Sequence, residues 1–125
     1  MKKALVAMVF LTAAPVFCAE LSPVVQTEIA YLFSHMENSG CEFNRNDSWH
    51  SASAARAHIQ KKYDYLMNRD LLTSTESFIK GAASESSISK QPYMVRCPGL
   101  PIVGSALWFQ DALEKYRKTR LNTAR

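Results

Sequence analysis

The chain has 125 residues, of which 47% are hydrophobic and 21% are charged, and its formal net charge is +4. This length suits one compact domain, and no internal repeat or linker divides it. The modest charge argues against a nucleic-acid-binding protein, which would need a strong basic stripe with interleaved aromatic residues.

Residues 1–19 have the pattern of a cleavable signal peptide. Two lysines give a positive start, residues 4–17 carry no charge, and Glu20 ends the apolar run. The run is too short to cross a bilayer as a helix, and no second one follows, so we expect no transmembrane segment in the mature chain. Cleavage after Cys18 and cleavage after Ala19 both stay open. The alternative to a signal peptide is a buried N-terminal helix.

Cleavage would leave one mature domain, residues 20–125, in which thirteen basic residues face eleven acidic ones. The remaining cysteines, Cys41 and Cys97, form an even pair in a compartment that keeps disulfides oxidised, so we expect them to be bonded. A catalytic thiol would need surroundings that stabilise the thiolate and protect it from oxidation, so a disulfide is the better interpretation.

The first expected helix begins at Ser22, a good N-cap, and Pro23, which suits the first helical position. Ser39 and Gly40 end it. Apolar residues recur along it at helical spacing: Val25, Ile29, Leu32, Phe33 and Met36.

Residues 41–45 alternate apolar and polar, which predicts a short strand with Cys41 and Phe43 facing inward. A turn at 46–48 follows. Ser51 is then the expected cap of a second helix that runs to about Asn68. Its apolar stripe has four members: Ala55, Ile59, Tyr63 and Leu66.

Residues 73–76 predict a capping box, with Thr73 as cap and Glu76 as its partner, for a third helix that buries Phe78 and Ile79. Residues 84–89 are polar and irregular, 91–97 read as a second strand, and 97–99 form a turn. Ser105 is the expected cap of a final helix. Four of its residues are expected to be partly buried: Leu107, Trp108, Leu113 and Tyr116.

Together these elements predict a small single α+β domain, with about four helices packed around a short antiparallel two-stranded sheet and one disulfide. If strands 41–45 and 91–97 pair, Cys41 and Cys97 come close enough to bond. The strand pairing and the disulfide therefore support each other.

Four segments resemble the YfeK-like family of small periplasmic bacterial proteins, a domain of unknown function. They cover roughly residues 41–99 and include Phe43-Asn44-Arg45-Asn46; His50, Ala55, His58 and Lys62; Thr75-Glu76-Ser77-Phe78-Ile79; and Ser86-Ser87-Ile88-Ser89-Lys90-Gln91-Pro92-Tyr93. The resemblance implies a periplasmic location and a shared fold, but no reaction. The chain departs from the family at Asp47, where Gly is favoured, and at Ala54, where an acidic residue is favoured.

A polar patch is the main candidate site. His58 and Lys62 share a helix face at i, i+4 spacing, and Arg45 and His50 lie on the preceding elements. The functional interpretation is a patch for an anionic ligand or partner; the alternative is a set of satisfied surface side chains. Trp49 is either an exposed anchor for a partner or a cap over the second helix.

Other chemistry finds little support in the sequence. The spacing of the histidines does not suit a metal site, so we expect no metal and no cofactor. No serine lies in a Gly-x-Ser-x-Gly motif, and an enzyme is not supported. We expect a non-enzymatic binding protein whose partner is another protein, such as an inhibitor or immunity protein that neutralises a toxic envelope-directed enzyme. The alternative is a small periplasmic hydrolase or anionic-ligand carrier that uses Arg45, His50, His58 and Lys62.

Overall fold

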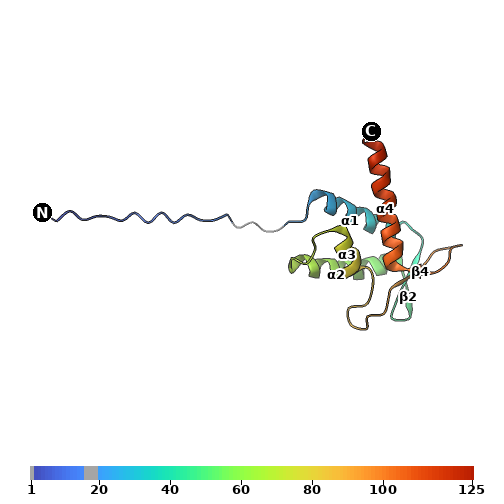
Figure 1. Ribbon diagram of the computed structural model, residues 1–125. Helices are drawn as coiled ribbons and strands as arrows, with labels where there is room; N and C mark the ends of the chain where they lie inside the picture. Colours follow the sequence, from blue (N-terminus) through green and yellow to red (C-terminus); the bar gives the residue numbers. More distant parts are fainter. Residues whose placement is uncertain (1, 16–19) are drawn as a thin grey trace.

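The computed structural model describes residues 2–15 and 20–125 (Figure 1). Residues 2–15 are exposed and form neither helix nor strand, so a buried N-terminal helix is not seen there. The expected cleavage positions, after Cys18 and after Ala19, lie outside the described residues. From residue 20 onward the elements are α1 Pro23–Glu37, β1 Glu42–Arg45, β2 Ser48–Ser51, α2 Ala52–Asn68, α3 Thr75–Ala82, β3 Met94–Arg96, β4 Val103–Gly104 and α4 Ser105–Thr123.

The domain is α+β, and its antiparallel sheet has the strand order β2-β1-β3-β4. Four strands replace the two expected from sequence. β1 and β3 are the expected pair. β2 reads Ser-Trp-His-Ser, which has no clear apolar alternation, and β4 has only two residues, too few to show a period of two.

Asn46 and Asp47 alone link β1 to β2, so the turn is one residue shorter than predicted. Their φ angles are 50° and 66°, which is the left-handed geometry of a two-residue hairpin turn. Asp47 therefore occupies a position that suits glycine, and its short polar side chain tolerates that conformation.

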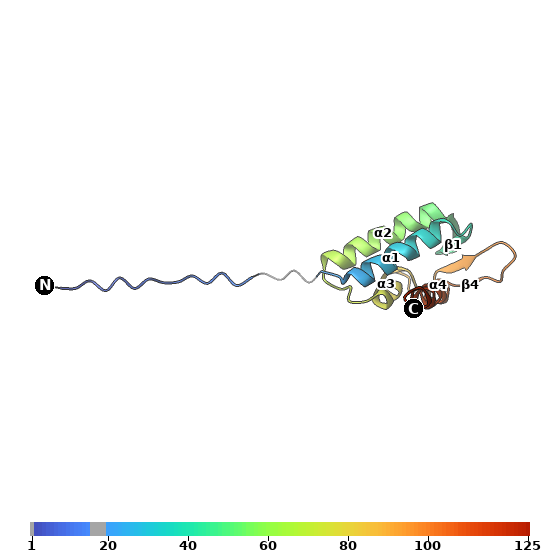
Figure 2. The same ribbon diagram turned by 90° about the horizontal axis from the view of Figure 1, so that it is seen from above.

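Two of the predicted helix starts are confirmed. The Ser22 side chain accepts a hydrogen bond from the Val25 amide before α1, and Ser51 does the same for the Ala54 amide at the start of α2. Figure 2 shows α1 and α2 running side by side in the domain.

The predicted caps of α3 and α4 are each wrong by one residue. Ser74 caps α3 and exchanges hydrogen bonds with Ser77, which leaves Glu76 free of a capping role. Gly104 precedes α4, and Ser105 is the first helical residue. The Ser105 hydroxyl is buried and donates to the Ala83 carbonyl at 2.6 Å, so it ties α4 to the end of α3 instead of capping a helix.

The core lies between the helices and one face of the sheet. Its largest fully buried side chains include Phe78 from α3, Phe109 from α4 and Leu32 from α1. The predicted burial on α4 is confirmed for Trp108, Leu113 and Tyr116. It is wrong for Leu107, which is 62% exposed. The buried face of α4 is turned toward Phe109 because this helix packs against both α1 and the sheet.

A buried carboxylate joins three helices. Glu28 on α1 accepts hydrogen bonds from the Thr75 hydroxyl on α3 at 2.7 Å and from Arg117 Nε on α4 at 2.6 Å. Arg117 also pairs with Glu76. Glu28 is 3% exposed, so the guanidinium and the hydroxyl replace the water that its carboxylate loses on folding.

The predicted disulfide joins Cys41 to Cys97, with 4.2 Å between their Cα atoms. The two cysteines lie one position beyond the Glu42–Arg96 pair of β1 and β3, so the strand pairing brings them together. No helix within residues 2–15 and 20–125 is long and apolar enough to span a membrane.

Candidate functional site

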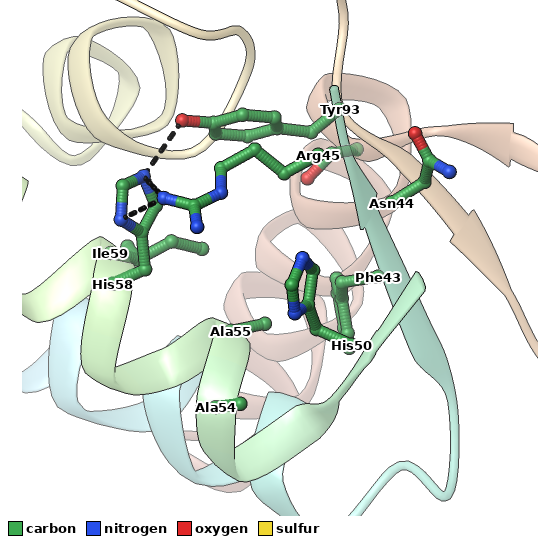
Figure 3. A pocket seen from close by; sticks show the side chains of 10 residues that line it. Phe43, Asn44, Arg45, His50, Ala54, Ala55, His58, Ile59 and Tyr93 are labelled. Carbon is green, nitrogen blue, oxygen red and sulfur yellow. Dashed lines mark hydrogen bonds between the residues drawn. The ribbon is translucent and has the colours of Figure 1, made fainter. Parts of the chain in front are cut away.

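A cavity of about 40 Å³ lies where the β1–β2 hairpin meets the first half of α2 (Figure 3). Four of its polar lining residues come from parts of the fold that are separated in sequence. Arg45 ends β1, His50 lies in β2, His58 lies on α2, and Tyr93 immediately precedes β3. Ile59 and Phe43 are among its apolar walls, and both are buried in the core.

The guanidinium of Arg45 contacts the ring of His58. Arg45 Nη1 lies 2.7 Å from Nδ1 and 3.1 Å from Nε2. Arginine has only donors, so Nδ1, at the shorter distance, accepts the hydrogen bond. A neutral imidazole with an accepting Nδ1 carries its proton on Nε2.

Tyr93 and Lys62 complete this network. His58 Nε2 lies 3.1 Å from the Tyr93 hydroxyl, and Lys62 Nζ lies 3.2 Å from the same oxygen. Both nitrogens are donors, so the tyrosine oxygen accepts twice and keeps its own proton to donate. Within the described part of the chain no residue accepts that proton. Lys62 also donates to the Glu85 carbonyl at 2.7 Å.

The ionisation of these groups follows from burial and from their neighbours. Burial lowers the pKa of His58, and the nearby charges of Arg45 and Lys62 lower it further. Burial also lowers the pKa of Lys62 and raises the pKa of Tyr93. His58 is therefore held in its neutral form and Tyr93 as a protonated phenol, which matches the hydrogen-bond assignment above.

The cavity offers donors and positive charge, and none of its lining residues is a carboxylate. Arg45 and Tyr93 supply donors at its wall, and Ala54 places the cavity beside the first turn of α2. The amino end of a 17-residue helix adds a partial positive charge there. A cavity with such walls suits a small anionic group more than a cation or a neutral apolar one.

The structure brings Arg45, His50 and His58 together at this cavity and joins Lys62 to it through Tyr93. Trp49 lies elsewhere. It belongs to β2 rather than to a turn, and it pairs with Asn44, one residue out of step with the inward-facing Phe43. Its side chain is therefore on the opposite face of the sheet, where the Arg96 guanidinium lies 4.2 Å from the centre of its ring.

Sequence reasoning missed Tyr93 and Ala54 as site residues. Tyr93 closes the last segment that resembles the YfeK-like family, and Ala54 is one of the two noted departures. Those two observations were the available signal.

No group of three or more His, Cys, Asp or Glu side chains in the described ranges is placed to hold a metal ion. The basic cavity would also repel one, because Arg45 and Lys62 adjoin it.

Fold and site together define a small disulfide-linked α+β domain with a basic cavity. The chain belongs to a family of unknown function (DUF5329), whose model matches residues 23–117. This match covers every helix and strand of the domain except the last residues of α4. No curated protein and no solved structure matches the chain.

Proposed function

We propose that this protein is an exported, non-enzymatic binding protein that holds one anionic group of a larger partner in the cavity of Arg45, His58 and Tyr93. One observation carries the proposal: Arg45 and the Tyr93 hydroxyl place donors at the cavity, none of its lining residues is a carboxylate, and the Tyr93 hydroxyl has a proton left to donate. A carboxylate accepts hydrogen bonds only, so it complements this arrangement.

The size of the cavity supports a group rather than a whole metabolite. About 40 Å³ holds a few atoms, whereas sites that enclose small-molecule ligands measure hundreds of Å³. A carboxylate at the end of a side chain fits such a space, and the rest of the partner would lie outside it. This favours a protein partner over a free ligand that is carried.

The residues of the cavity also favour binding over hydrolysis. Ser105 lines the cavity, but its hydroxyl donates a hydrogen bond to the Ala83 carbonyl, and the residue is only 1% exposed. His58 has Arg45 on one nitrogen and Tyr93 on the other, so no hydroxyl or thiol nucleophile is held against a free base. A small hydrolase is therefore the weaker alternative.

An inhibitor or immunity protein against an envelope-directed enzyme is the particular binding role that we propose. The signal-peptide pattern of residues 1–19, the resemblance to periplasmic YfeK-like proteins and the disulfide all support export to the periplasm. Mass spectrometry of the exported protein should give a chain that starts at Ala19 or Glu20. An intact amino terminus in the mature pool would contradict export by cleavage.

Acetate is the simplest probe of the cavity. We expect acetate, titrated into the purified protein, to shift the NMR signals of the His58 ring and of residues around Tyr93. Arg45→Ala should remove this response. Arg96→Ala is the matched control, because Arg96 lies on the opposite face of the same sheet and should leave the response unchanged.

A second variant fills the site without removing a cation. Ala54 lines the cavity, so Ala54→Asp places a carboxylate beside its donors and should compete with acetate. Acetate shifts that persist equally in Arg45→Ala, Ala54→Asp and Arg96→Ala would show that acetate binds elsewhere, and the proposal would fail.

A further inference from the structure

A groove lined by lysines adjoins the basic cavity. α2 and α3 lie side by side (Figure 1). The groove runs along these two helices and past the loop of residues 84–90. Its two halves measure about 380 and 340 Å³ and share Leu66, Gly81 and Ser87. Because they share these residues, the two hollows adjoin each other, and together they make up the groove.

Lys62 links the groove to the cavity. Its side chain lines the first half of the groove, and its Nζ donates to the Tyr93 hydroxyl, which faces the cavity. A partner segment that lies in the groove therefore needs to pass only Lys62 to reach the cavity.

The groove is strongly biased toward positive charge. Lys61, Lys62, Lys80 and Lys90 line it, against one acidic residue, Glu85. The whole mature chain has an excess of only two positive charges, so this concentration is local. Such a patch attracts an anionic partner and raises its rate of association.

The groove also contains apolar surface. Tyr65 and Leu71 are 54% and 55% exposed, and the Leu66 side chain lies against Gly81 at its floor. The lack of a side chain at Gly81 lets Leu66 pack closely against α3, since a Cβ there would lie 2.9 Å from Leu66 Cδ1. Sugar and phosphate chains have few apolar groups to place here, whereas a peptide has leucine or similar side chains.

We propose that this groove binds an acidic, amphipathic segment of a partner protein, with one carboxylate of that segment in the Arg45 cavity. The inference rests on the proposed function and names its partner class. A carboxylate at the end of a side chain can enter the small Arg45 cavity. The phosphates within a nucleic-acid chain cannot, because each is linked to sugars on both sides. Acidic and leucine-like residues alternating along the segment would match the lysines and the apolar floor.

A dye-labelled synthetic peptide of alternating Glu and Leu residues tests the proposal by fluorescence anisotropy with the full chain. We expect the Lys61→Ala, Lys80→Ala double variant to weaken peptide binding about tenfold. The matched control is Lys115→Ala, Lys118→Ala, which also removes two exposed helical lysines but lies outside both hollows. Its effect should stay below about twofold. Arg45→Ala should weaken the binding of both the peptide and acetate.

Each outcome separates the two proposals. If the protein binds acetate but both double variants weaken peptide binding equally, the groove is not the peptide site. That result would overturn the groove proposal and leave the proposal for the cavity standing. If Arg45→Ala leaves peptide binding unchanged, the bound segment does not reach from the groove into the Arg45 cavity, and that part of the proposal fails. Failure of acetate to bind would overturn the proposed function itself. Tighter lysine-dependent binding of a polyuronate or of oligo(dT) than of the peptide would overturn the choice of partner.

Discussion

At the scale of single residues, the site depends on which ring nitrogen of His58 carries the proton. Two cationic donors, Arg45 and Lys62, contact the His58–Tyr93 pair, and they assign the accepting role to Nδ1 and leave the tyrosine proton free. The charges of the same two groups oppose protonation of the ring. The protonation state of His58 therefore affects both the hydrogen bonds of the cavity and the stability of the fold.

This coupling predicts a dependence of stability on pH. Unfolded His58 takes up a proton near its ordinary pKa of about 6.5, whereas the folded chain does so only at lower pH, because burial and Arg45 lower its pKa. The unfolded state gains the proton first, so the free energy of unfolding should fall as the pH falls through about 6.5. His58→Gln should reduce the difference between melting temperatures at about pH 7.5 and about pH 5.5.

His35 sets the background for that measurement. Its pKa is lowered by burial and by Lys115, so it contributes a slope of the same sign, which the variant retains. An unchanged pH dependence in His58→Gln would contradict the neutral assignment of His58.

Trp49 allows a prediction that separates the two faces of the sheet. It is half-buried, and its ring is covered by Arg96, so Trp49→Ala should cost about 1 kcal/mol or less of unfolding free energy. The acetate response should not change, because Trp49 does not line the cavity. Chemical denaturation and the NMR titration measure the two effects. A lost acetate response would place Trp49 in the site.

At the scale of elements, the cluster of Glu28, Thr75 and Arg117 holds α4 against α1 and α3. A hydrogen bond from Arg117 lowers the pKa of Glu28 and opposes the effect of burial, so the carboxylate stays ionised between the helices. α4 in turn packs Phe109 against the core and follows directly from β4. The cluster therefore fixes the sheet edge relative to the helices.

Arg117→Ala should leave the buried Glu28 carboxylate without its charged partner. We expect a loss of about 2 kcal/mol of unfolding free energy, at the lower end for a broken buried pair because Arg117 is 43% exposed. Lys118→Ala is the control on the same helix. Its pair with Glu114 is exposed, so the change should cost less than about 0.5 kcal/mol. Equal losses in urea denaturation would argue against a structural role for the cluster.

At the scale of the whole molecule, the disulfide joins cysteines 56 residues apart, and the loop that it closes contains α2, α3 and every cavity-lining residue except Ser105. In the chain-entropy model such a bond lowers the conformational entropy of the unfolded state, which stabilises the folded state by about 4 kcal/mol. That is a large share of the stability of a domain of this size.

The double variant Cys41→Ser, Cys97→Ser should therefore unfold at a markedly lower denaturant concentration than the oxidised protein. Urea titration followed by far-UV circular dichroism measures the difference, which we expect to be about 4 kcal/mol. The oxidised protein with a reductant added provides the comparison that leaves the sequence unchanged. Equal stability of oxidised and reduced protein would contradict the prediction.

The sequence alone determined the features that rest on local chemistry. The starts of α1 and α2, the central strand pair and the Cys41–Cys97 bond follow from caps, periodicity and cysteine count, each readable within a short window. It also grouped Arg45, His50, His58 and Lys62 as a polar patch. These features need no knowledge of what lies across the core.

Only the tertiary structure decided the rest. β2 and β4 are strands because neighbouring strands take up their backbone hydrogen bonds, and their short sequences carry no signal of it. Tyr93 lines the cavity although it lies 35 residues beyond His58 in the sequence. Trp49 does not line the cavity, because the strand register places its side chain on the other face of the sheet. In β2, which has no clear apolar alternation, the pairing with β1 sets the direction in which each side chain points.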